Sequence, residues 1–243
     1  MKKKAYNIIH EDDVLLALDK SAGTLCVPDR YDITKPNLLH YLTDRYQEIF
    51  PVHRLDRGTS GVMLYAKNAE THKQLSVLFE ERTIHKVYHT IVKGCPNQKE
   101  GEIDAPIGND KTQKQKAIHA RGQHALTHYK VLKEWNGYSL LECIISTGRQ
   151  HQIRLHMRHI GCPLAYDKKY GEDEPIYASD IKRRRFNKKD EDRTPRALMD
   201  RLSLHAYELT FSHPSDGKTV TYQAPYHKDF RALCNQLDKW AIK

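Results

Sequence analysis

Two segments rich in alternating apolar residues, 124–132 and 138–145, flank the pair Asn136-Gly137. Asn-Gly readily adopts the positive φ angles of a two-residue β-turn, so this stretch predicts a β-hairpin. A second hairpin is predicted where segments 204–213 and 218–222 flank the turn at 214–217. Antiparallel strand pairing is therefore the strongest constraint on the fold.

Other segments predict strands and helices that are interspersed along the chain. Short apolar runs predict a strand pair over 6–18, a buried strand over 61–68 and an alternating strand over 86–93. Helical spacing of apolar residues predicts helices over 36–47, 69–84, 148–161 and 227–243. Residues 95–123, rich in Gly, Pro, Lys and Gln, predict irregular loops. This order favours an α+β fold with a mixed, largely antiparallel sheet flanked by helices.

Composition indicates a folded globular protein with a polyanionic partner. The 243 residues include 39% hydrophobic residues, enough for one domain over 1–243 with a full core. Forty Lys and Arg against 31 Asp and Glu give a net charge of +9, which favours a nucleic acid partner. We expect a monomer.

The cysteines and the apolar runs predict a cytoplasmic protein. The five cysteines form no CxxC pair, which predicts reduced thiols rather than a disulfide framework or a zinc site. No segment approaches the about 18 apolar residues of a membrane span, and the N-terminal stretch lacks the apolar run of a signal peptide. We expect no metal, no cofactor and no membrane partner.

Segment 172–196 differs from the rest because charged residues dominate it. One interpretation is a solvated surface insertion. The other is contact with RNA phosphates through its basic residues, although acidic neighbours partly cancel their charge. Those basic residues are Arg183, Arg184, Arg185, Lys188 and Lys189.

Asp56 lies between two cations, Arg54 and Arg57, and a Gly-Thr-Ser-Gly turn follows. Nearby positive charge stabilises a carboxylate, and an ionised carboxylate can act as a nucleophile or a general base. The simpler interpretation is an Asp that caps a turn, and the residues alone favour it.

A second polar stretch, 146–171, has Arg154 among apolar residues of a predicted helix. A cation in such a setting needs a carboxylate partner or a ligand phosphate, unless its aliphatic stem merely covers the core. Three histidines, His151, His156 and His159, are not spaced to share one tight helical face, which argues against a metal site. On the predicted strand 86–93, Tyr88 could stack on a nucleobase or pack in an ordinary core.

Together these stretches resemble the RluA-type pseudouridine synthases, which isomerise uridine in structured RNA. HRLDRGTSG is similar to the family motif HRLDxxTSG, and KVYHTIVKG to KxYxAxVxG. TGRQHQIRLHMRHIGCPLAYDKKYG is similar to TGRxHQIRxHxxxxGxPIxGDxxYG. LDKSAGTLCVP resembles the opening motif NKPxGxxV, and LHAYELTFSHP a late strand of the family. The matches run in order from about residue 14 to 225.

The resemblance implies a pseudouridine synthase fold with a central RNA-binding cleft, and an isomerase of rRNA or tRNA. Asp56 would be the catalytic aspartate, Tyr88 would stack on the flipped uracil, and Arg154 would pair with Asp56. Residues implied to contact RNA are Arg54, Arg57, Arg149, His151, Gln152 and Arg158. The resemblance implies no metal and no cofactor.

The chain departs from the family patterns at Ser21, Ala22, His89, Thr90, Ala165 and Tyr166. These positions lie outside the implied catalytic trio, so they affect the choice of substrate more than the chemistry. About a dozen residues precede the first motif, so we expect no separate S4-like domain. The alternatives are a non-catalytic RNA-binding protein, a metal-independent nuclease that uses His and Lys, and a fold relative without activity.

Overall fold

Two fully buried strands, β2 (Leu15–Lys20) and β4 (Ser60–Ala66), lie at the centre of the first of two compact units. The structure is a computed structural model that describes residues 4–110, 112–182 and 196–242. Unit 1 comprises Met1–His89, Ile144–Gln150 and Leu204–Pro225. Unit 2 comprises Thr90–Cys143, His151–Ser203 and Tyr226–Lys243.

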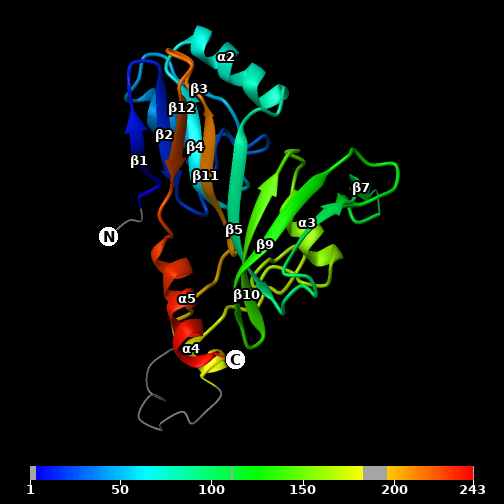
Figure 1. Ribbon diagram of the computed structural model, residues 1–243. Coiled ribbons are helices and arrows are strands. Elements are labelled where there is room, and N and C mark those ends of the chain that lie inside the picture. Colours follow the sequence, from blue (N-terminus) through cyan, green and yellow to red (C-terminus); the bar gives the residue numbers. More distant parts are fainter. Residues whose placement is uncertain (1–3, 111, 183–195, 243) are drawn as a thin grey trace. The chain divides into compact units, whose positions relative to one another are not determined.

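Unit 1 contains a mixed sheet in which the strand order is β1-β2-β4-β11-β5, with β12 paired to β11 and β3 to β4 (Figure 1). The pairs β1–β2, β2–β4 and β11–β12 are antiparallel, whereas β4 and β11 run parallel. The other elements are β1 (Tyr6–Glu11), α1 (Leu38–Thr43), β3 (Phe50–Pro51), α2 (Ala69–Glu80), β5 (His85–Lys93, divided between the units), β11 (Leu204–Ser212) and β12 (Thr219–Gln223).

The central strands of unit 1 are buried on both faces, which explains why they read as continuous apolar runs. Successive side chains of a strand point to opposite faces, so each run supplies two cores. On one face Leu15 and Leu64 pack with Leu75 of α2. On the other face Leu16 and Met63 pack with Leu38 and Leu42 of α1. The same cluster includes Cys26, from the segment between β2 and α1, and Leu55, from the loop that leads into β4.

Unit 2 contains the strand order β5-β10-β9-β6 and a separate hairpin, β7–β8. Helix α5 buries Phe230, Leu233 and Leu237 in a core with Ile91 and Trp135. The elements are β6 (Glu100–Asp104), β7 (Ile107–Asp110), β8 (Gln115–Ile118), β9 (Leu126–Trp135), β10 (Tyr138–Ile145), α3 (Gln152–His159), α4 (Ala178–Ile181) and α5 (Lys228–Trp240).

The predicted α+β class with a largely antiparallel, mixed sheet is confirmed. Both predicted hairpins are present, and Gly137 has the positive φ of 82° that its turn requires. The loops predicted over 95–123 are wrong, because this stretch forms β6, β7 and β8. These strands are short and few of their residues are buried, so they show little of the alternation that marks a strand in sequence.

The whole basic cluster predicted within the charged segment 172–196, from Arg183 to Lys189, lies outside the described residues. The described part of the segment includes α4. Among the helices of the described ranges, none is both long and apolar enough to cross a membrane. The chain divides into two compact units. Whether they act as the single catalytic domain predicted over 1–243 is not tested by this division, so that expectation stays a prediction.

Candidate active site

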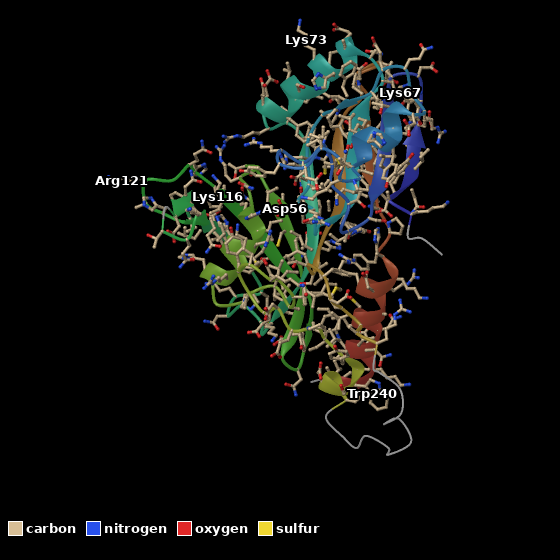
Figure 2. All side chains as sticks on the ribbon, turned by 180° about the vertical axis from the view of Figure 1, so that it is seen from behind. Asp56, Lys67, Lys73, Lys116, Arg121 and Trp240 are labelled. Atoms are coloured by element: carbon tan, nitrogen blue, oxygen red, sulfur yellow. The ribbon has the colours of Figure 1, made fainter. Side chains whose placement is uncertain are left out.

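The loop between β3 and β4 carries Asp56, which is labelled in Figure 2. The Thr59 amide donates to the Asp56 carbonyl oxygen over 3.0 Å and closes the turn. The residue Asp56 is half-buried, while Arg54 and Arg57 on either side are exposed. The loop thus combines a partly desolvated carboxylate with two cations that can reach a polyanion.

The Gly-Thr-Ser-Gly segment after Asp56 joins the loop to the sheet. Ser60 and Gly61 pair in parallel with His205 and Ala206 of β11. Gly61 has a φ of 115°, and a Cβ there would collide with the carbonyl oxygen of Ala206. The glycine is therefore required by both backbone conformation and close strand approach. This contact determines where β4 begins, and hence where the Asp56 loop ends.

Tyr88 of β5 lies within electrostatic reach of Asp56. Burial raises the pKa of the Tyr88 phenol, and the negative charge of the Asp56 carboxylate raises it further. The phenol is therefore protonated at neutral pH. Tyr88 also packs against the core cluster that contains Leu55, the residue before Asp56. Two of the three residues predicted as catalytic therefore lie in the same part of unit 1, although they come from different elements.

His53, three residues before Asp56, has a structural role that was not predicted from the sequence. Its Nε2 accepts a hydrogen bond from the Leu64 amide over 3.0 Å, so its proton is on Nδ1. The ring stacks on Phe79 with centroids 4.8 Å apart. Burial, followed by the positive charge of Lys86, lowers the pKa of His53 to about 3. The ring is therefore neutral at physiological pH and ties the loop to β4 and α2.

Arg154 of α3 binds a carboxylate in unit 2. Its Nε donates to Asp167 Oδ2 and its Nη2 to Asp167 Oδ1, each over 2.7 Å. Both residues are buried, and Oδ1 also accepts the amides of Lys169 and Tyr170. The sequence predicted a carboxylate or phosphate partner for this cation, and Asp167 is such a partner. The signal was available, because Asp167 lies in the same motif as Arg154.

The predicted pairing of Arg154 with Asp56 stays a prediction. Asp56 lies in unit 1 and Arg154 in unit 2. A guanidinium has five N–H donors, so the two bonds to Asp167 do not exhaust Arg154.

The remaining predicted RNA contacts lie in α3 and just before it. The Gln152 side chain is buried, and its Nε2 donates to the Leu126 carbonyl oxygen and to Thr127 Oγ1. His151 has a positive φ of 61°, and its Nδ1 lies 2.7 Å from the Tyr170 hydroxyl. Arg149 is half-buried and belongs to unit 1, whereas Arg158 is exposed in unit 2. Their contacts with RNA, and a central cleft, stay predictions.

Among the described residues, no group of three or more His, Cys, Asp or Glu side chains is placed to hold a metal ion. His156, one of the three histidines considered for such a site, is buried, with its Nε2 3.0 Å from the Ala105 carbonyl oxygen.

Comparisons with known proteins give a consistent result. The model of the RNA pseudouridylate synthase family matches residues 14–159. An RNA pseudouridine synthase of Bacillus subtilis is 34% identical over 242 residues, which cover 96% of this chain and 73% of the relative. The ribosomal large subunit pseudouridine synthase D of Neisseria meningitidis is 34% identical over 241 residues, 96% of this chain and 61% of the relative. This chain therefore spans about two thirds of these relatives.

A solved structure shares the fold. The human RNA pseudouridylate synthase domain containing 4 superposes with a TM-score of 0.70 at 25% identity. The superposition covers 95% of this chain and 92% of the human chain.

Proposed function

Because this chain belongs to the RNA pseudouridine synthase family, we propose that it isomerises uridine to pseudouridine in a structured RNA, with Asp56 as the catalytic carboxylate. The observation that carries the proposal is that Asp56 and Tyr88, from separate elements, share one part of unit 1: Tyr88 packs against the core cluster that contains Leu55, and burial together with the Asp56 charge raises the pKa of its phenol. A protein that only binds RNA has no need of a half-buried carboxylate beside a phenol.

The reaction breaks the N1–C1′ glycosidic bond, turns the uracil and forms a C5–C1′ bond. The C5 proton is released and N1 gains a proton, so that atoms and electrons balance without a redox partner. In the proposal Asp56 attacks either C1′ of the ribose or C6 of the base, and both routes stay open. Because the cleaved base must stay beside its sugar, positioning carries much of the catalysis.

The target nucleotide must leave its base stack before the carboxylate can reach it, at a cost of a few kcal/mol. In the proposal Tyr88 stacks on the flipped uracil and recovers about 1–3 kcal/mol. The charge of Asp56 is one cause of the raised pKa of Tyr88. If Asp56 forms an ester with the substrate, that charge is lost and the Tyr88 pKa falls. The phenol would then become a better candidate to assist removal of the C5 proton.

The exposed Arg54 and Arg57 lie on either side of Asp56 in sequence, and we assign them to the phosphates next to the flipped nucleotide. The further contacts proposed for the same RNA are Arg149, His151, Gln152 and Arg158. In the proposal Arg154 orients Asp56, while Asp167 binds the guanidinium of Arg154 through two hydrogen bonds. Monomeric state and cytoplasmic location stay predictions.

We propose ribosomal RNA as the target rather than transfer RNA. The support is the name of the Neisseria meningitidis relative, which describes an enzyme of the large ribosomal subunit.

The test is a map of pseudouridines in total RNA from cells that lack this chain and from cells that express it again. We expect one or a few rRNA pseudouridines to disappear and to return. Loss from tRNA alone would keep the activity and reassign the target. Unchanged maps of both RNAs would contradict the proposal and favour a non-catalytic RNA-binding protein, and RNA cleavage in chelator would favour a nuclease.

A further inference from the structure

We propose that Cys26 is a positioning residue for Asp56, because its thiol holds the main chain of the residue just before that carboxylate. The inference rests on the proposed function of Asp56 and assigns a part of the machinery that lies outside the predicted trio.

The thiol of Cys26 contacts both polar groups of the Leu55 main chain. Cys26 Sγ lies 3.2 Å from the Leu55 carbonyl oxygen, to which it donates, and it accepts the Leu55 amide over 3.3 Å. Both residues are buried, with 4% of Cys26 and 6% of Leu55 exposed. Buried main-chain groups need partners, and here one side chain serves the two groups of Leu55.

The turn that precedes Cys26 holds the other side of Asp56. The Gly23 amide donates to the Arg57 carbonyl oxygen over 2.7 Å, and Arg57 Nε donates to the Gly23 carbonyl oxygen over 3.0 Å. The fully buried ammonium of Lys20 donates to the same Arg57 oxygen over 3.3 Å. The residues on both sides of Asp56 are therefore bound by one segment, 20–26.

Packing connects this segment to Tyr88. Cys26, Leu55 and Tyr65 belong to one core cluster of unit 1, and Tyr88 packs against that cluster. The Tyr65 hydroxyl donates to the Cys26 carbonyl oxygen over 3.2 Å, which anchors Cys26 to β4. A shift of Cys26 would therefore change the position of Asp56 relative to the phenol.

Replacement of Cys26 by Val separates hydrogen bonding from shape. Val has a similar apolar volume, but it can neither donate to the Leu55 carbonyl nor accept from its amide. The two buried main-chain groups would lose their partner, and the loop would move to find another. A displacement of about 1 Å at a reacting group can lower the rate about 100-fold.

The experiment compares Cys26→Val, Cys26→Ser and Cys143→Val with the wild-type chain. Ser keeps a donor and an acceptor, and Cys143 is another buried cysteine, on β10. Tritium release from C5-labelled rRNA transcripts gives kcat and KM. Hydrogen exchange at the Leu55 amide reports the contact without reference to activity.

For Cys26→Val we expect kcat to fall about 10- to 100-fold with KM unchanged, and the Leu55 amide to exchange at least about tenfold faster. Cys26→Ser restores both values to near those of the wild type, and Cys143→Val changes neither. If Cys26→Val does not fold, Cys26→Ala is measured in its place. Unchanged kcat in the folded variant, unchanged Leu55 exchange, or no recovery in Cys26→Ser would overturn the inference. An inactive wild-type chain would overturn the proposed function, and Leu55 exchange would still show whether the thiol holds the loop.

Discussion

At the scale of single residues, the conformation of the Asp56 loop depends on the neutral ring of His53 as well as on charged groups. His53 accepts the Leu64 amide only while Nε2 carries no proton, and the pKa of about 3 preserves that state. Folding therefore opposes protonation of His53. The unfolded chain, with an ordinary His pKa of 6.5, gains a proton as the pH falls below that value.

This difference predicts how stability depends on pH. The contribution of His53 is complete above pH 6.5 and is lost as the pH falls from 6.5 towards 3, because the unfolded state binds one proton more in that window. His53→Gln keeps an acceptor for Leu64 but removes the titration. Urea unfolding at several pH values between 4 and 7 gives the free energy of unfolding as a function of pH. In His53→Gln its slope should be smaller than in the wild type by up to about 1.4 kcal/mol per pH unit. His85→Gln, at an exposed residue, serves as the control, and equal slopes in His53→Gln and wild type would disprove this account.

At the scale of elements, the parallel contact between β4 and β11 positions the end of the Asp56 loop. Gly61 allows this contact because no side chain comes between its backbone and Ala206. Gly137 in the β9–β10 hairpin has a positive φ too, but a Cβ there would meet nothing within 4 Å. Alanine substitutions at the two glycines therefore distinguish two costs in unfolding free energy: the positive φ alone at Gly137, and the positive φ plus a collision at Gly61.

Gly137→Ala should cost only the positive φ, about 1–2 kcal/mol of unfolding free energy. Gly61→Ala should cost clearly more, because the strands must separate as well, and it should lower activity with stability. Urea unfolding followed by circular dichroism measures both. Equal losses for the two variants would show that the close contact with Ala206 has no energetic weight.

Sequence patterns predicted these elements where the local signal was strong. Asn136-Gly137 predicted a hairpin, and the run 61–68 predicted a buried strand close to the observed β4. The strands β6 to β8 were missed because few of their residues are buried. Asp56 and Tyr88 could be selected from motifs. The contacts of Cys26 could not, because its partner is a main chain distant in sequence and nothing in a lone cysteine indicates it.

At the scale of the whole molecule, binding and chemistry depend on different features. In the proposed function the net charge of +9 favours RNA binding through phosphate contacts, which do not need the Asp56 carboxylate. In the proposed mechanism the chemistry needs that carboxylate, which the 20–26 segment holds through the residues on either side of it and whose charge acts on Tyr88. Removal of the Asp56 charge should therefore separate the two properties.

The most direct measurement is tritium release from C5-labelled rRNA by Asp56→Asn, with RNA affinity measured in parallel. Asp44→Asn, at an exposed aspartate of unit 1, is the matched control. We expect Asp56→Asn to release no tritium above background while its RNA dissociation constant stays within about threefold of wild type. We expect Asp44→Asn to behave as wild type. Near-normal tritium release by Asp56→Asn would contradict the assignment of Asp56 as the catalytic carboxylate.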